Sequence, residues 1–298
     1  MLLQLTSLET MYVIGGTSSL TVAEDISKKL KQPLARTTIK RFPDDEWYVR
    51  VLDDIKGEDV LIVQTTYPDT KIIELLLLQD AVYEAGANKI IIVIPYFGYC
   101  RQDKKFETGE SISARAIAEH ISLHADYVIT VDPHKDYLLD FFNVPAISCS
   151  AVSEIANYLK MKEINFVLAP DKGAKKTAKE AGNIIGCEYD YMDKTRIDAN
   201  TVEIKPKKLE ARNKNVALID DIISTGGTMA KSIKELKKQG ARKTLVACTH
   251  GLFIDGAKEK LYSNGCDEII STDTIENEFS KVKVAPVVID ALVRDKII

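Results

Sequence analysis

Residues 216–228 read Val-Ala-Leu-Ile-Asp-Asp-Ile-Ile-Ser-Thr-Gly-Gly-Thr. The first four are continuously apolar, which is typical of a parallel strand that is buried on both faces of a sheet. A helix is expected to begin at Gly227. Beyond it, Met229, Ile233 and Leu236 recur at spacings of four and three, which predicts a helix over 227–239 with one buried face. A buried strand that passes through polar residues into an amphipathic helix predicts an α/β fold.

Short apolar runs and longer amphipathic segments alternate along the rest of the chain in the same way. They predict strands at residues 60–64, 89–94, 127–131, 166–169 and 244–248. They predict helices at residues 70–85, 113–124, 151–160 and 174–181. Gly86, Gly182 and Gly240 follow three of the predicted helices, at the position where glycine commonly ends a helix. We therefore expect doubly wound, mostly parallel sheets covered by helices.

The length of 298 residues, at about 150 residues per domain, predicts two domains. A new helix is expected near residue 150, so we place an N-terminal α/β domain at residues 1–149 and a C-terminal one at 150–298. The first apolar run begins at Met11, and we expect residues 1–10 to form a loose extension.

Composition argues against several classes of protein. Forty basic residues stand against 44 acidic ones, and this net charge of −4 argues against non-specific binding of nucleic acid. No apolar run approaches the ~18 residues of a membrane span, so no membrane partner is expected. The five cysteines are scattered without a Cys-x-x-Cys pair, which predicts reduced thiols and a cytoplasmic location.

Four polar clusters each follow a predicted strand directly. They occupy residues 96–103, 131–134, 170–173 and 220–228. Ligands of open α/β sheets bind outside the carboxyl ends of the strands, so four clusters at such positions favour an enzyme over a scaffold.

The cluster at residues 220–228 indicates the kind of ligand. Gly226 and Gly227 permit a tight turn with exposed N–H groups, which makes an anion site where a helix begins. Asp220 and Asp221 would repel a bare phosphate but accept hydrogen bonds from a ribose diol, so a sugar phosphate suits both parts. The alternative is a helix start capped by serine or threonine. Neither a Walker A loop nor a Gly-x-Gly-x-x-Gly motif occurs.

Residues 220–228 resemble the phosphoribosyl-pyrophosphate motif that phosphoribosyltransferases share with ribose-phosphate pyrophosphokinases. Residues 41–46, 95–103 and 131–134 resemble the second family, in the same order, and the resemblance extends from about Met11 to the C-terminus. It implies two domains of the phosphoribosyltransferase type, with ATP bound by the N-terminal one. It also implies an ATP-dependent diphosphotransferase, which moves the β,γ-pyrophosphoryl group of ATP to O1 of ribose 5-phosphate. A salvage phosphoribosyltransferase and a non-catalytic regulatory paralogue remain alternatives.

The resemblance also implies roles for particular residues. Those for ribose 5-phosphate are Arg196, Asp220, Asp221, Ser224, Thr225, Gly226, Gly227 and Thr228. Those for ATP are Phe42, Asp44, Asp45, Glu46, Arg101 and Gln102. Phe42–Glu46 would hold adenine from a neighbouring subunit, which implies a homo-oligomer. Many relatives have glycine where this chain has Asp45, which lacks the conformational freedom of glycine.

The metal and the catalytic cations complete the implied site. His134 and Asp171 match the magnesium ligands of the family, although magnesium prefers oxygen to the imidazole of His134. Lys194 and Arg196 match its catalytic pair, on a polar segment expected to form a hairpin or flap; without the resemblance they would be interpreted as surface cations. His120 and His124 lie four apart on a predicted helix and are interpreted as surface residues.

Overall fold

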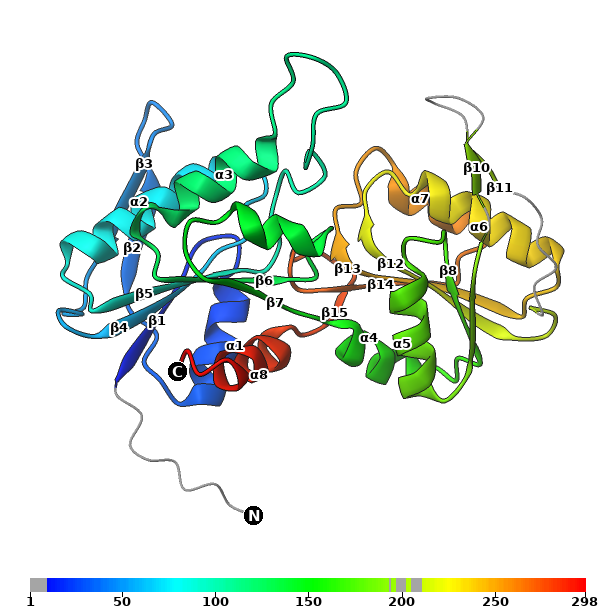
Figure 1. The fold of residues 1–298 in the computed structure, drawn as a ribbon. Helices are drawn as coiled ribbons and strands as arrows, with labels where there is room; N and C mark the ends of the chain where they lie inside the picture. The colour runs from blue at the N-terminus through cyan, green and yellow to red at the C-terminus, as the bar shows by residue number, and fades with distance from the viewer. Residues whose placement is uncertain (1–9, 193, 197–201, 205–210) are drawn as a thin grey trace. The chain divides into compact units, whose positions relative to one another are not determined.

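The computed structural model describes residues 10–192, 194–196, 202–204 and 211–298 (Figure 1). All but the last residue of the expected extension at residues 1–10 lies outside the described part. The chain divides into two compact units, one made of Met1–Cys149 with Val284–Ile298, the other of Ser150–Lys283. No helix among the described residues is long and apolar enough to cross a bilayer.

The first unit is built on a five-stranded parallel sheet. Its strands, in spatial order, are β1 (Met11–Gly15), β4 (Asp59–Val63), β5 (Lys89–Ile94), β6 (Tyr127–Val131) and β7 (Ala146–Cys149). Leu34 forms a parallel bridge to Val13 of β1, which pairs with β4 through Leu61. The order in which strands are added therefore reverses between β1 and β4, which is the position where doubly wound sheets commonly bind ligands.

Helices cover both faces of this sheet. They are α1 (Leu20–Leu30), α2 (Thr70–Glu84), α3 (Ser113–Ile121) and α8 (Ala285–Arg294), with 3₁₀ turns η1 (Ser122–His124) and η2 (Asp136–Phe141). α1 packs against α8 and α2 against α3, so the two pairs form the outer layers seen in Figure 1. A separate antiparallel hairpin of β2 (Thr37–Arg41) and β3 (Trp47–Val51) packs on α2.

The second unit is built on a six-stranded parallel sheet. Its strands, in spatial order, are β15 (Ser280–Val282), β14 (Glu268–Thr272), β13 (Lys243–Gly251), β12 (Asn215–Ile223), β8 (Phe166–Ala169) and β9 (Glu188–Tyr191). Its helices are α4 (Val152–Lys160), α5 (Lys175–Ile185), α6 (Gly227–Lys238) and α7 (Ala257–Ser263). α4 packs against α5 and α6 against α7, again as two layers. β10 (Lys194–Arg196) and β11 (Val202–Ile204) form a separate antiparallel pair.

These two sheets confirm the predicted α/β fold with parallel, doubly wound sheets. Gly86 and Gly240 have φ values of 79° and 83°, as expected of residues that end α2 and α6. The prediction for Gly182 was wrong, because α5 continues to Ile185 and Gly186, with φ 82°, ends it. Gly182 instead admits the neighbouring strand, since a Cβ there would lie 3.0 Å from Tyr189.

The last segment of the chain does not follow the predicted domain boundary. Val284–Ile298 belongs to the first unit, whereas the prediction placed these residues in the second domain. Its helix α8 contacts α1 and β7 and buries Val288 and Leu292 completely. The chain thus returns to the first unit, where α8 lies beside α1.

Candidate active site

The turn between β12 and α6 requires glycine at position 226. Gly226 has φ 67°, in the left-handed region that other residues adopt at a cost. A Cβ at this position would lie 3.4 Å from both Ala257 and Leu261 of α7. The next residue, Gly227, is in open space, because a Cβ there would meet only Thr225 Oγ1, at 3.9 Å. A ligand can therefore approach the backbone at Gly227 closely.

The first turn of α6 has no side-chain cap. Gly226 is the N-cap residue, and no side chain makes a capping hydrogen bond there, although Ser224, Thr225 and Thr228 are near in sequence. The alternative of a helix start capped by serine or threonine is therefore wrong. Uncapped N–H groups at the positive end of a helix dipole favour an anion.

Three carboxylates lie beside this turn. Asp220 and Asp221 are in β12, and Asp171 follows the neighbouring strand β8, which pairs with β12 up to Leu168 and Leu218. Burial raises the pKa of Asp220 well above its usual value, and the negative charges of Asp221 and Asp171 raise this pKa further. β12 and β8 flank the point where the strand order of this sheet reverses, so the carboxylates lie where a ligand is expected.

This donor set fits a hydrated, phosphate-bound divalent cation. No group of three or more His, Cys, Asp or Glu side chains within the described ranges is arranged as a complete metal site. Magnesium commonly keeps several waters and takes other ligands from substrate phosphates, so it does not need such a cage. A cation would also offset the repulsion that raises the pKa of Asp220.

The two predicted metal ligands belong to different units. Asp171 Oδ1 accepts hydrogen bonds from the backbone N–H groups of Gly173, at 2.8 Å, and Ala174, at 3.3 Å, so the carboxylate also shapes the turn into α5. His134 lies in the first unit, half-buried after β6, two residues beyond Asp132 with its φ of 36°.

Residues that follow β13, which no motif in the sequence indicated, support the turn between β12 and α6. The N–H groups of Leu252 and Phe253 donate to the carbonyl of Ile223, at 3.0 and 3.1 Å. Ile254 N–H donates to the carbonyl of Ser224 at 3.1 Å.

Lys260 of α7 completes this support. Its Nζ donates to the carbonyl of Thr225 at 2.6 Å, so three successive carbonyls of the turn accept hydrogen bonds from residues 252–260. Phe253 and Asp255 adopt φ values of 45° and 53° within that stretch. Most of these donors are backbone groups, which no side-chain motif reports.

The predicted adenine loop is the exposed tip of the β2–β3 hairpin. The N–H of Phe42 donates to Glu46 O at 2.8 Å, and the N–H of Asp45 donates to Phe42 O at 3.0 Å. Asp45 has φ 69°, so it adopts the left-handed backbone that glycine favours, and Arg41 donates a hydrogen bond to its carbonyl. The Phe42 side chain is 43% exposed, and Asp44 and Glu46 are also exposed.

The predicted ATP residues Arg101 and Gln102 follow β5 after a sharp turn. Tyr99 has φ 63° in that turn. Arg101 is exposed, whereas Gln102 is half-buried and its Nε2 donates to Lys104 O at 3.4 Å. The backbone of Gln102 also accepts from Ala114 N–H at 3.2 Å, at the start of α3.

The predicted catalytic cations lie on a strand of the small antiparallel pair. In β10, Lys194 pairs with Ile204 and Arg196 with Val202 of β11. Their side chains lie outside the part of the chain that the structure describes.

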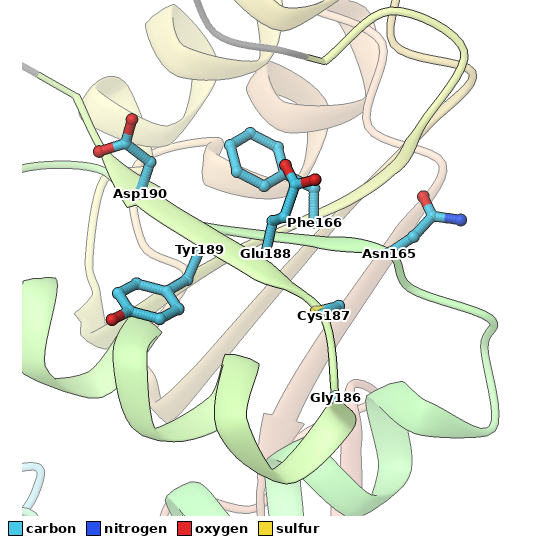
Figure 2. A pocket seen from close by; sticks show the side chains of 7 residues that line it. All are labelled: Asn165, Phe166, Gly186, Cys187, Glu188, Tyr189 and Asp190. Atoms are coloured by element: carbon cyan, nitrogen blue, oxygen red, sulfur yellow. The ribbon is translucent and has the colours of Figure 1, made fainter.

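Two further features lie apart from these residues. His120 is exposed and its Nδ1 lies 2.7 Å from Ala116 O, while the His124 ring stacks on Tyr83, so both are surface residues of their helix and 3₁₀ turn. A cavity of about 710 Å³ beside the edge strand β9 contains none of the predicted site residues (Figure 2). Its lining is Asn165, Phe166, Gly186, Cys187, Glu188, Tyr189 and Asp190.

Comparisons with known proteins agree with this architecture. The family model described as the N-terminal domain of ribose phosphate pyrophosphokinase matches residues 11–124, and the model of the phosphoribosyl transferase domain matches residues 146–285. A ribose-phosphate pyrophosphokinase of Methanopyrus kandleri is 39% identical over 286 residues, 95% of this chain and 98% of that protein. One from Pyrococcus furiosus is 43% identical over 268 residues, 89% of this chain and 95% of its own length.

A solved structure is similar over the same length. The phosphoribosylpyrophosphate synthetase of Mycobacterium smegmatis has a TM-score of 0.83 and 27% identity, and the match covers 97% of this chain and 100% of that one. Two family models in series, and relatives close to 40% identical along nearly the whole chain, show that the chain belongs to the ribose-phosphate pyrophosphokinase family.

Proposed function

We propose that this chain transfers the β,γ-pyrophosphoryl group of ATP to O1 of ribose 5-phosphate and releases phosphoribosyl pyrophosphate and AMP. The observation that carries the proposal is the uncapped turn before α6, with Asp220, Asp221 and Asp171 beside it. The activity by which its relatives are named agrees with this proposal. A salvage phosphoribosyltransferase would need no counterpart of the matched pyrophosphokinase N-terminal domain at residues 11–124.

The sugar phosphate would be bound in two parts. The N–H groups and hydroxyls of residues 224–228 would bind the 5-phosphate, because they are donors at the positive end of α6. Asp220 and Asp221 would accept hydrogen bonds from the ribose hydroxyls. O1 of the sugar would then be the atom that attacks the β-phosphorus of ATP. In the transfer the O1–Pβ bond forms, the bond from Pβ to the oxygen bridging it to Pα breaks, and AMP leaves with that oxygen.

ATP would be bound mainly by the first unit. Arg101 and Gln102 would contact its polar groups, while Phe42 would stack on adenine and Asp44, Asp45 and Glu46 would present acceptors to its amino group. All four loop residues are exposed, which suits a loop that serves a neighbouring subunit.

A homo-oligomer is supported by a second feature. Two apolar residues of α2 one turn apart, Ile73 and Leu77, are 52% and 37% exposed. An apolar helix face left uncovered in one chain is typical of an interaction surface.

His134 and Asp171 would hold magnesium together with phosphate oxygens of ATP. When bound, the cation would neutralise phosphate charge and so lower the barrier to attack by O1. Lys194 and Arg196 would contact the transferred group, where charge shifts among the phosphate oxygens in the transition state.

All five cysteines are thiols without disulfides, as expected in a reducing compartment such as the cytoplasm.

One incubation tests the proposed function. The protein is mixed with ribose 5-phosphate, ATP and magnesium, and the nucleotides are separated by chromatography. We expect AMP and phosphoribosyl pyrophosphate in equal amounts. ADP as the product, or a requirement for a nucleobase, would contradict the proposal, and nucleotide binding without turnover would indicate a regulatory paralogue. For a variant of Asp220, Asp267→Asn is the matched carboxylate control. Asp267 lies just before β14, at the end of the sheet opposite to Asp220, and pairs with Lys237 at 2.8 Å.

A further inference from the structure

The hairpin that bears the adenine loop is not part of the main sheet. β2 and β3 pair only with each other, and β3 packs against α2 (Figure 1). Because no strand of the five-stranded sheet hydrogen-bonds to this hairpin, contacts at its base determine the position of its tip at Phe42–Glu46.

Trp47 is the main contact at this base. It is the only tryptophan of the chain, and it is the first residue of β3, opposite Arg41 at the end of β2. Its Nε1 donates to the carbonyl of Thr70 at 3.1 Å, where α2 begins. Its ring contacts two cations, the Arg41 guanidinium carbon at 3.6 Å and Lys71 Nζ at 4.6 Å from the ring centre. Cation–π contacts of this kind are strongest when the cation has lost water.

Lys71 is held in place from the other side by a buried carboxylate. Its Nζ lies 2.9 Å from Glu74 Oε2 and also donates to Thr17 Oγ1. The side chain of Glu74 is 0% exposed and that of Lys71 only 18%. Most lysine pairs on protein surfaces are exposed and loosely ordered, and contribute little. This one is ordered by burial.

Glu74 is in turn fixed to the turn that follows β1. Its Oε1 accepts from the N–H of Thr17 at 2.6 Å, and its Oε2 accepts from Thr17 Oγ1 at 2.7 Å. Charge-assisted hydrogen bonds to a buried carboxylate are short and resist displacement. A continuous series of contacts therefore leads from the main sheet through Thr17, Glu74 and Lys71 to Trp47.

We propose that Lys71 and Glu74 are positioning residues for nucleotide binding, which act by fixing Trp47 and, through it, the loop at Phe42–Glu46. The inference rests on the proposed function, because it takes that loop to contact adenine. Neither residue takes part in bond making or breaking. Both act on the ATP side alone, because the sugar-phosphate turn lies in the other unit.

The test removes the buried pair without leaving a buried charge. Lys71→Met alone would leave Glu74 charged and buried, so it is combined with Glu74→Gln, which keeps the acceptor for Thr17. Trp47→Leu removes the ring independently of the pair, and Lys71→Arg keeps the cation. Lys89→Met is the matched control, because Lys89 pairs with Asp59 at 3.2 Å at the amino end of the same sheet.

Steady-state kinetics separate positioning from general damage. We expect the double variant and Trp47→Leu to raise KM for ATP about tenfold, with KM for ribose 5-phosphate and kcat within about twofold of the unmodified enzyme. Lys71→Arg should recover most of the loss, and Lys89→Met should change neither KM. An equal rise in both KM values, or an unchanged KM for ATP in Trp47→Leu, would overturn the inference.

Tryptophan emission provides a readout that needs no turnover. In the double variant we expect the emission of Trp47 to shift to longer wavelength without ligand, because the ring loses its fixed contacts. We also expect ATP to change the emission of the unmodified protein, with a Kd that the double variant raises about tenfold. If no AMP forms, the proposed function fails while this titration still decides the inference. Unchanged emission on saturation with ATP would refute it.

Discussion

Two adjacent glycines in the turn before α6, the proposed phosphate site, allow stability and binding to be separated by the same small substitution. Gly226→Ala places a side chain on a residue with φ 67°, which costs about 1–2 kcal/mol. The loss of glycine freedom in the unfolded chain returns about 0.4–1 kcal/mol. The neighbours of the new Cβ lie at 3.4 Å, an ordinary contact distance, and add little. We therefore expect a net loss of about 1 kcal/mol and a Tm lower by about 2–4 °C.

Gly227→Ala should have the opposite signature. This residue is the first of α6, and a Cβ there meets nothing closer than 3.9 Å, so alanine should leave Tm unchanged or slightly higher. The open space around Gly227 is where the 5-phosphate is expected to lie. A methyl group there displaces the sugar phosphate by about 1 Å, which should lower kcat/KM for ribose 5-phosphate by about 10²-fold.

Thermal melts and steady-state kinetics of the two variants, with ribose 5-phosphate and ATP varied separately, measure both effects. KM for ATP should stay within about twofold for Gly227→Ala, because the nucleotide is assigned to the other unit. A Gly227→Ala protein with normal kcat/KM for ribose 5-phosphate would refute the phosphate assignment, however stable it is. If Gly227→Ala lowered Tm as much as Gly226→Ala does, the inference that only Gly226 needs the left-handed backbone would be refuted.

Three further substitutions test other parts of the site. Asp220→Ala should raise KM for ribose 5-phosphate while the Kd of ATP, measured by calorimetry, stays nearly unchanged; equal damage to both would contradict the division between the units. Lys260→Met removes the donor to Thr225 O, and should raise KM for ribose 5-phosphate by about fivefold, with no effect if the turn holds its shape unaided. Lys194→Ala should lower kcat by at least about 10²-fold, or ~2.7 kcal/mol, with Tm unchanged, and an unchanged kcat would leave the segment as a surface strand.

The elements that the sequence predicted well are those whose signal is local. The apolar runs at Lys89–Ile94 and Tyr127–Val131 are buried on both faces, and their strands begin and end as predicted. The end of α5 was misplaced because a glycine has two uses that look identical in sequence. Gly186 ends the helix with a left-handed backbone, whereas Gly182 provides room for Tyr189. Only the packing of β9 on α5 distinguishes them.

Other features depend on contacts between distant segments, so a local pattern could not report them. The return of α8 to the first unit depends on its contacts with α1 and β7, and the sequence of an amphipathic helix does not indicate which element it packs against. The support of the phosphate turn by Leu252, Phe253 and Ile254 uses backbone donors, which any residue supplies. Asp45 shows the converse, because its side chain lacks the conformational freedom of the glycine that many relatives have there. It nevertheless adopts φ 69°, in the left-handed region that Asp tolerates better than most residues.

The point where strand order reverses has different surroundings in the two units. In the first, the point where strand order reverses is filled by the protein itself. Ser18 N–H donates to Gln64 Oε1 at 3.3 Å, Thr17 N–H donates to Glu74, and a Cβ at Gly16 would lie 2.1 Å from Gln64 Oε1.

In the second unit the corresponding point has open space at Gly227 and mutually repelling carboxylates. Hydroxyl donors of a ligand, or a bound cation, would offset this repulsion. The fold alone would assign a ligand to both points, and the proposal places the sugar phosphate at the second because carboxylates there can accept hydrogen bonds from ribose hydroxyls. The first unit is thereby left to contribute to the reaction through its hairpin and the turn after β5, which are the segments assigned to ATP.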